Sequence, residues 1–422
     1  MKKKLALAAA IGVVVLTASG CSASSEGDAT TIELWTSWSE GEATAETLDP
    51  LIQEWADEQG YTVNQTNFTY DQIHEKLIAS AAGGNLPDVV WGLPEYVGEF
   101  SKLGILADVS DAWGDWDDAG DVSEAVKNAM TVDGQVVGFP YETTARAYLV
   151  HDDLLADAGV DVPTTWDEVL DVGSKVDDAT GSSFYGLTGA GVREPQELLV
   201  YLAQQGLTIA EEQDGGGYAN TWNDNPEELE KAASVFQFYK DLMESGAVNE
   251  NSATYGWEDT DENFATGLTA TFVTGNWLAE REGTNPDTMG DVSVHPIPAP
   301  SDGEAATYIE SKPIFTMAGS DSLEASTELA QQFASQEWQE AAFADRSSLS
   351  TVSTDSKWSK DFAALLDSGV TYPPISLGEV TQNMIDSVAK VLQEGDTPEE
   401  AAAWLSDAIN ESLETSGDAA GN

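Results

Sequence analysis

Short strand-like runs alternate with helical patterns along this chain. Residues 32–36 (IELWT) alternate apolar and polar side chains, as a half-buried strand does, and apolar residues at helical spacing follow over 48–56. A second strand is expected over 61–68, a helix over 73–81, and a short buried strand over 88–91. Because strands separated by helices pair in parallel, the predicted fold class is α/β, with parallel βαβ units and a doubly wound sheet.

The same alternation returns in the second half of the chain. Strand-like runs lie at 147–150 and 185–187, with a helical pattern over 165–176 between them. The stretch 381–413 is helical, with a cap expected at 396–398 (DTP). The chain has 422 residues, which at about 150 residues per domain predicts two or three domains. Two α/β lobes are the simplest arrangement of these segments.

The N-terminus has the features of a secretory signal. Lysines at positions 2–4 precede an apolar run over 5–18, which is shorter than the ~20 residues that a membrane-spanning helix needs. Residues 16–21 (LTASGC) resemble the bacterial lipobox, whose cysteine receives a diacylglycerol group. We therefore expect 1–29 to be a lipoprotein signal and tether, lipidated at Cys21, with the folded body anchored to the extracytoplasmic face of the cell membrane. The alternative is an ordinary signal peptide in which Cys21 is incidental.

Acidic residues dominate the charge of the chain. There are 75 Asp and Glu against 17 Lys and Arg, so the net charge at neutral pH is -58. Such a chain is repelled by phosphate backbones, so we expect no nucleic-acid partner. A single cysteine cannot form an internal disulfide, three histidines leave little for histidine-based chemistry, and the motifs of serine hydrolases, phosphate-binding loops and zinc proteases do not occur in the sequence. The sequence therefore predicts no metal, no cofactor and no catalytic residue.

Several segments resemble, in a fixed order, those of one protein family. They include 81–91 (AAGGNLPDVVW), 138–159 (GFPYETTARAYLVHDDLLADAG), 163–169 (PTTWDEV) and 264–277 (FATGLTATFVTGNW). Their order and spacing behind a lipobox are similar to those of the extracellular solute-binding proteins of sugar ABC importers, the family that includes maltose-binding protein. The resemblance covers nearly the whole chain after the tether.

The resemblance implies a two-lobed periplasmic-binding-protein-like fold of type II, with a ligand cleft between the lobes and multiple hinge crossings. The crossings are expected near 141–144, 308–312 and 345–350. The expected division is lobe 1 (30–142 and 311–345), lobe 2 (143–310 and 346–415) and a tail (416–422). The implied partners are a small sugar ligand and the ABC permease subunits with their cytoplasmic ATPase, and we expect a monomer.

A sugar presents hydroxyl groups and an apolar C–H face, so its site needs aromatic rings and polar side chains that form hydrogen bonds. The resemblance places the substrate-binding residues in both lobes and at the crossings: Trp38, Ser39, Glu40, Trp91, Glu95, Tyr96, Thr143, Thr144, Arg146, Glu194, Gln196, Trp257, Asn276, Trp277 and Ser311. Tyr372, Ser376 and Glu379 are minor candidates.

Structural roles compete with these expectations. Trp38 and Trp91 could instead pack in the core of their lobe, Arg146 could form an ion pair that holds the hinge, and any single carboxylate such as Glu194 is weak evidence in so acidic a chain. Gly92 stands where maltose-binding protein has a stacking tryptophan, so the identity of the sugar does not transfer.

Three functions stay open at this point. The first is capture of a carbohydrate, expected to be an oligosaccharide because several aromatic candidates suit several rings. The second is the same scaffold with a polyamine as ligand, held by cation–π contacts. The third is a lipid-anchored enzyme that acts on polysaccharides.

Overall fold

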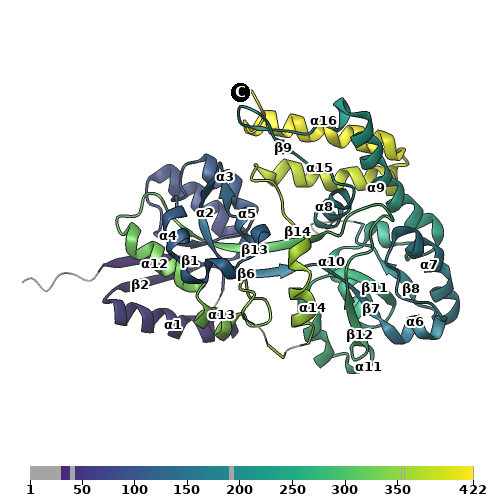
Figure 1. Cartoon of the computed structure of the whole chain (residues 1–422), viewed down its shortest axis with the longest axis horizontal. Helices are drawn as coiled ribbons and strands as arrows, with labels where there is room; N and C mark the ends of the chain where they lie inside the picture. Colours follow the sequence, from purple (N-terminus) through teal and green to yellow (C-terminus); the bar gives the residue numbers. More distant parts are fainter. Residues whose placement is uncertain (1–29, 39–42, 190–193, 353, 356, 422) are drawn as a thin grey trace, which may run out of the picture.

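The computed structural model describes residues 30–38, 43–189, 194–352, 354–355 and 357–421, which form the two lobes seen in Figure 1. The predicted lipidation site Cys21 lies outside the described residues. Each lobe has its own sheet and its own buried core. Within the described ranges, no helix is both long and apolar enough to span a membrane.

Lobe 1 is built on a mixed sheet. Its strand order is β14-β13-β3-β1-β2, with β6 also paired to β13. The strands are β1 (Thr31–Thr36), β2 (Thr62–Asn67), β3 (Val89–Trp91), β6 (Gly138–Ala145), β13 (Thr307–Thr316) and β14 (Gly369–Val370). β1 pairs in parallel with β2 and β3, as predicted, but β13 runs antiparallel to β3 and β6. The prediction of parallel βαβ units describes β1 to β3 but not β13, because β13 returns from lobe 2 and no βαβ crossover sets its direction.

Helices cover the lobe 1 sheet with their apolar faces turned inward. Leu48, Ile52 and Ala56 of the first helix are buried, as the helical spacing predicted. Thr69 and Gln72 form a capping box at the start of the second helix. The helices of this lobe are α1 (Ala43–Gln59), α2 (Tyr70–Gly83), α3 (Tyr96–Lys102), α4 (Ser110–Asp115), α5 (Glu124–Asn128), α12 (Leu323–Phe333) and α13 (Gln336–Ala342); a small hairpin consists of β4 (Thr131–Val132) and β5 (Gln135–Val136).

Lobe 2 has a four-stranded sheet in the order β12-β7-β11-β8, buried on both faces. Along β7, Tyr148 and Val150 join the main core of the lobe, while Ala147 and Leu149 join a smaller core on the opposite face. The strands are β7 (Ala147–His151), β8 (Ser183–Gly186), β11 (Thr269–Thr274) and β12 (Val292–His295), and a separate hairpin consists of β9 (Glu211–Glu212) and β10 (Tyr218–Ala219). The helices are α6 (Asp152–Ala158), α7 (Trp166–Thr180), α8 (Glu194–Gln204), α9 (Pro226–Ser245), α10 (Trp257–Ala265), α11 (Pro286–Met289), α14 (Ser359–Ala363), α15 (Leu377–Ala389) and α16 (Pro398–Ser416).

Three segments join the lobes, and the cores show where each one crosses. The first runs from β6, whose Tyr141 packs in lobe 1, to β7 in lobe 2. The second is β13, where Tyr308 belongs to the lobe 2 core and Ile309 to the lobe 1 core. The third lies between Val352, in the lobe 1 core, and Trp358, in the smaller lobe 2 core. This third crossing comes later than the expected 345–350.

The end of the chain packs on lobe 2. The C-terminal helical stretch divides into α15 and α16, and Thr397 and Glu400 form the capping box that the DTP signal predicted for α16. Beyond α16, Ala419 packs against the lobe 2 core and an Asp418 carboxylate oxygen accepts a hydrogen bond from the Ser376 backbone N–H at 2.9 Å. Residues 417–419 are therefore part of lobe 2, although 416–422 were expected to be a tail.

Candidate ligand-binding site

The antiparallel strands β6 and β13, which we call the crossing ribbon, present two chemically different faces. Glu142 lies opposite Lys312 and Thr144 lies opposite Glu310, whereas Thr143, between them, lies opposite Ser311. Because successive side chains of a strand point to opposite faces, Glu142, Lys312 and Glu310 share a charged face. Thr143 and Ser311 belong to the other, hydroxyl face.

Ion pairs run along the charged face and connect the first two crossings with the segment before the third. Lys312 Nζ lies 2.5 Å from Glu142 Oε1 and 3.9 Å from Glu310 Oε1. Arg346, which precedes the third crossing, places Nε 2.7 Å from Glu142 Oε2. Arg146 NH2 lies 3.0 Å from Glu310 Oε2. Since Glu142 is buried, its charge depends on both Lys312 and Arg346 for compensation.

Arg146 is the centre of the site because it meets groups from both lobes. Its guanidinium donates to Gln196 Oε1 at 2.6 Å, on α8 of lobe 2, and to Glu310 of the ribbon. The guanidinium carbon lies 4.7 Å from the centroid of the Trp277 ring and 5.3 Å from that of the Tyr308 ring. The arginine side chain is only 6% exposed. A buried, planar cation with five donors is suited to several hydroxyl or carboxylate oxygens at once.

We call Arg146 and the groups around it, Gln196, Trp277, Tyr308 and Glu310, the Arg146 cluster. Glu95 of lobe 1 adds a further carboxylate beside this cluster. It follows β3 at the carboxyl end of the strand, where α/β sheets place their ligand groups. Burial and the neighbouring carboxylate of Glu310 raise the pKa of Glu95 from its usual 4.5 to about 7, against the opposing effects of Lys312 and Arg146. Burial and the charge of Glu95 also raise the pKa of Tyr372, which contacts Tyr308 edge to face with ring centroids 5.5 Å apart. At neutral pH Glu95 therefore exchanges between the acid and the carboxylate.

Trp277 is held in place by its own backbone environment. It follows β11 and Gly275, and a Cβ added at Gly275 would lie 1.8 Å from the Trp277 ring atom Cζ3. Because Gly275 has no Cβ, the indole ring of Trp277 can pack against the backbone at Gly275. The indole N–H donates to Asp261 Oδ2 at 3.2 Å. The ring is half-buried, at the edge of lobe 2 that faces Arg146.

A groove between the lobes opens beside this cluster. It has a volume of about 940 Å³ and is lined by His74, Glu95, Tyr96 and Glu99 of lobe 1 and by Ser376, Leu377 and Glu379 of lobe 2. In Figure 1 these residues belong to the region between α2 and α3 on one side and α15 and α16 on the other. Glu95 lines the groove and also faces the Arg146 cluster, so it connects the two. A groove of this size suits a small organic ligand.

The structure does not place every expected residue at this site. Trp38 is 3% exposed, stacks on Tyr141 and donates to Asp49, so it belongs to the lobe 1 core. Trp91 is 1% exposed in the same core. In both cases the structural alternative describes the residue: Trp38 packs on Tyr141 after the half-buried strand β1, and Trp91 is the last residue of β3, which is buried at every position.

Other expected residues are placed as follows. Thr143 bonds to the Ser311 hydroxyl at 3.0 Å, so both belong to the hydroxyl face. Asn276 donates to the Asp345 carbonyl at 2.9 Å, and Trp257 begins α10 with its side chain 37% exposed. Thr144 is a weak partner of Arg146, at 3.5 Å. Ser39 and Glu40 lie outside the described residues, and of Glu194 only its place at the start of α8 is described.

The sequence analysis missed three groups of the charged face as ligand candidates: Glu142, Glu310 and Lys312. A signal was present, because the chain has only 17 Lys and Arg and three of them, Arg146, Lys312 and Arg346, lie at or beside the lobe crossings. Lys and Arg are rare in so acidic a chain. Several of them close together therefore indicate that a buried carboxylate or a bound ligand is compensated by their positive charge.

The arrangement can bind a polar, uncharged molecule from both sides. Glu95, Arg146 and Gln196 offer donors and acceptors, and the half-buried Trp277 and Tyr372 offer ring surfaces. The positive and negative groups of the cluster largely neutralise each other, so the site has no strong excess charge for a charged ligand.

A family model described as "Bacterial extracellular solute-binding protein" matches residues 51–366. In sequence the chain is similar to the diacetylchitobiose binding protein DasA of Streptomyces coelicolor, with 26% identity over 248 residues, which are 55% of this chain and 52% of that protein. It is also similar to the lactose-binding protein of Rhizobium radiobacter, with 25% identity over 253 residues, 56% of this chain and 54% of that protein. The chain thus spans about half the length of these curated relatives.

Solved structures share the fold over almost the whole chain. The GacH receptor of Streptomyces glaucescens, known unliganded and in complex with acarbose, has a TM-score of 0.74 and 24% identity, covering 92% of this chain and 99% of that one. The sugar-binding protein MalE of Xanthomonas citri has a TM-score of 0.75 and 21% identity, covering 92% of this chain and 98% of that one. These likenesses confirm the predicted two-lobed fold class.

Proposed function

The chain belongs to the bacterial extracellular solute-binding proteins, and on that premise we propose that it captures a carbohydrate outside the cytoplasmic membrane and delivers it to an ABC importer. The observation that carries the proposal is the convergence on Arg146 of groups from the crossing ribbon and lobe 2, with the lobe 1 carboxylate of Glu95 close enough for the Arg146 charge to affect its pKa. A ligand bound there touches both lobes at once. Such a ligand stabilises the closed arrangement relative to the open one.

The chemistry of the site supports a carbohydrate ligand. Arg146, Gln196 and Glu95 suit hydroxyl groups, and the rings of Trp277 and Tyr372 suit the apolar faces of sugar rings. The relatives include binding proteins named for diacetylchitobiose and lactose, which are both disaccharides. The groove of about 940 Å³ next to Glu95 has room for further rings, so we propose an oligosaccharide.

A polyamine fits this site less well. Arg146 already lies over the ring of Trp277, the position that a ligand ammonium would take in a cation–π contact. The carboxylates of Glu142 and Glu310 are already engaged by Lys312, Arg346 and Arg146, so they are not open to the ammonium groups of a polyamine.

We also propose that the carbohydrate leaves chemically unchanged. Hydrolysis of a glycosidic bond needs a protonated acid together with a second carboxylate that faces the substrate. Glu95 has the raised pKa of such an acid, but Glu310 and Glu142 are engaged by Arg146, Lys312 and Arg346. This pairing supports binding rather than catalysis.

The remaining parts of the proposal concern location and partners. The lipobox at 16–21 supports a lipid anchor at Cys21 on the extracytoplasmic face of the cell membrane. The partners are an ABC permease with its cytoplasmic ATPase, and the protein acts as a monomer. Mass spectrometry of the membrane-extracted protein tests the anchor: it is expected to find a diacylated Cys21 as the first residue, and an unmodified thiol there would contradict the anchor.

Titration of intrinsic tryptophan fluorescence with a panel of mono-, di- and trisaccharides tests the central proposal, with spermidine as the competing ligand class. We expect saturable binding of at least one di- or trisaccharide, and a loss of at least about tenfold in affinity in Arg146→Ala and Trp277→Ala. Arg281→Ala is the matched control, because Arg281 pairs with Glu262 on the exposed surface of lobe 2. Binding of spermidine alone, or product release from a bound oligosaccharide, would contradict the proposal.

A further inference from the structure

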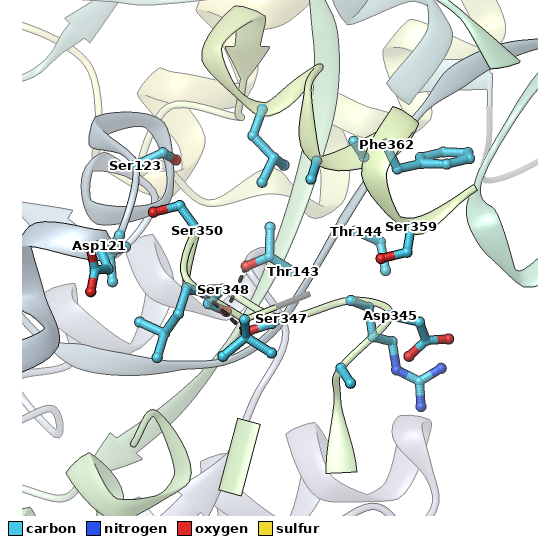
Figure 2. Close-up of a pocket in the computed structure, with 18 of the residues that line it drawn as sticks. Asp121, Ser123, Thr143, Thr144, Asp345, Ser347, Ser348, Ser350, Ser359 and Phe362 are labelled. Carbon is cyan, nitrogen blue, oxygen red and sulfur yellow. Dashed lines mark hydrogen bonds between the residues drawn. The ribbon is translucent and has the colours of Figure 1, made fainter. Parts of the chain in front are cut away.

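A second cavity lies behind the crossing ribbon, on its hydroxyl face, and we call it the rear cavity. It has a volume of about 370 Å³ and is lined by residues of both lobes and of the ribbon. Figure 2 shows Ser123 and Ser350 on one side, Ser359 and Phe362 on the other, and Thr143 between them. None of the residues that line the rear cavity also lines the groove beside Glu95.

The lining of the rear cavity is rich in hydroxyl groups and also includes charged side chains. Ser123 comes from lobe 1, Thr143 from the ribbon, Ser348 and Ser350 from the segment before the third crossing, and Ser359 from lobe 2. Phe362 contributes an apolar surface. The charged Asp121, Asp345 and Arg346 also contribute to the lining. This combination of hydroxyls with an apolar patch matches a small molecule that carries hydroxyls on a carbon chain or ring.

The hydroxyl groups that have protein partners keep capacity for a ligand. Thr143 bonds to Ser311 and to Ser348, and Ser123 accepts from the Val126 backbone N–H at 3.3 Å. Each hydroxyl has one donor and two acceptor positions, so one or two such bonds do not exhaust it. Arg346 contacts Glu142 through Nε only and has four more N–H donors in its fork.

We propose that the rear cavity is a second binding site, for a small polyhydroxylated solute such as a polyol, distinct from the site at Arg146. The rear cavity shares no lining residue with the groove beside Glu95, and its lining includes Thr144, a weak partner of Arg146, and Arg346, which pairs with Glu142. A rotation of the lobes about the crossings that closes the groove beside Glu95 separates Ser123 of lobe 1 from Phe362 of lobe 2 at the rear. A solute that fills the rear cavity prevents these residues from approaching and so opposes opening of the groove. Occupancy of the rear cavity therefore favours the closed lobes.

Calorimetric titration with xylitol tests the site, with the zwitterion glycine betaine as the control solute. We expect the wild-type protein and Arg146→Ala to bind xylitol with affinities within about twofold of each other. Ser350→Trp fills the cavity and is expected to weaken xylitol binding by at least about tenfold, whereas Ser301→Trp, on an exposed turn, is expected to change nothing. Ser359→Ala removes one hydroxyl without adding bulk and is expected to weaken binding less, by about threefold.

Several results would overturn the proposal. They are a wild-type protein that does not bind xylitol saturably, loss of xylitol binding in Arg146→Ala, and unchanged xylitol binding in both Ser350→Trp and Ser359→Ala. The sugar panel is read separately, so failure of the proposed function at Arg146 is distinguishable from failure of the rear site.

The predicted coupling has its own measurement. Spin labels on Ala79→Cys in α2 and Gln382→Cys in α15, in a Cys21→Ser background, report the distance across the groove, and both positions are exposed. With Arg146→Ala added, xylitol alone is expected to shift the distance distribution toward shorter values. A distribution that xylitol leaves unchanged, or shifts to longer values, would refute the coupling.

Discussion

Arg146 organises the site because an acidic chain has few cations to place and this one is nearly buried. Its guanidinium joins Gln196, Glu310 and the ring of Trp277, so residues from distant parts of the sequence meet around one charge. The ring of Trp277 depends in turn on Gly275, which has no Cβ to displace it. Two predictions follow from these contacts at the level of single residues.

Gly275→Ala is expected to weaken carbohydrate binding by about tenfold with little loss of stability. The new Cβ would lie 1.8 Å from the Trp277 ring, so the ring must move, while the φ of -104° at this position is open to alanine. Calorimetric titration and urea unfolding check the two effects. Gly319→Ala is the control, since a Cβ there meets open space and the position lies outside the groove. Unchanged affinity in Gly275→Ala would show that Trp277 is not part of the binding surface.

Glu95→Gln is expected to change how the stability of the unliganded protein depends on pH. The folded-state pKa of about 7 lies above the value of 4.5 for an exposed glutamate, so the folded state holds the proton more tightly. The Glu95 contribution is therefore fully present below about pH 4.5 and is lost as the pH rises to about 7. Relative to wild type, Glu95→Gln should gain up to about 3 kcal/mol between pH 4 and pH 8, measured by urea unfolding. A wild-type-minus-variant difference that does not vary over this range would contradict the raised pKa.

The crossing ribbon carries the charges that hold its two strands and the segment before the third crossing together. Glu142 of β6 contacts Lys312 of β13 and Arg346 in the segment before the third crossing, so one carboxylate connects both strands of the ribbon with that segment. Successive side chains of each strand point to opposite faces of the ribbon. The ion pairs therefore lie on one face, and the hydrogen bonds of the Thr143 hydroxyl lie on the other. Loss of the Glu142 carboxylate should therefore destabilise both strands of the ribbon together.

Glu142→Gln is expected to destabilise the protein by about 3 kcal/mol, because Lys312 and Arg346 are left close together with less compensation. Glu262→Gln is the matched control: its partner Arg281 is exposed, and the expected loss is below about 1 kcal/mol. Urea unfolding of both variants measures the difference. Equal losses in the two variants would mean that the ribbon pairs contribute no more than a surface pair.

Local periodicity in the sequence predicted individual elements well and their pairing less well. The patterns over 32–36, 61–68 and 147–150 correspond to β1, β2 and β7. The antiparallel direction of β13 relative to β3 and β6 could not be predicted. The direction of a strand that returns from another lobe depends on contacts between residues far apart in sequence. Tryptophans at and after the ends of strands posed a similar problem: Trp91, the last residue of β3, is in the core, whereas Trp277, after β11, is at the site, and only packing on neighbouring elements separates the two.

The whole molecule combines two separate cores with a polar site between them, which is the arrangement that permits closure without unfolding. The crossings are few, and most buried side chains belong to one lobe or the other. The groove beside Glu95 has lobe 1 residues on one wall and lobe 2 residues on the other, so its width depends on the angle between the lobes. Ligand capture and lobe movement are therefore the same event in this account.

The distance across the groove between spin labels at Ala79→Cys and Gln382→Cys tests this account most directly, measured with and without the saccharide that binds in the fluorescence titration. We predict a shift to shorter distances on saturation with the saccharide, and no shift when Arg146→Ala is added. A distribution that stays the same although the saccharide is bound would contradict closure of the lobes around the ligand.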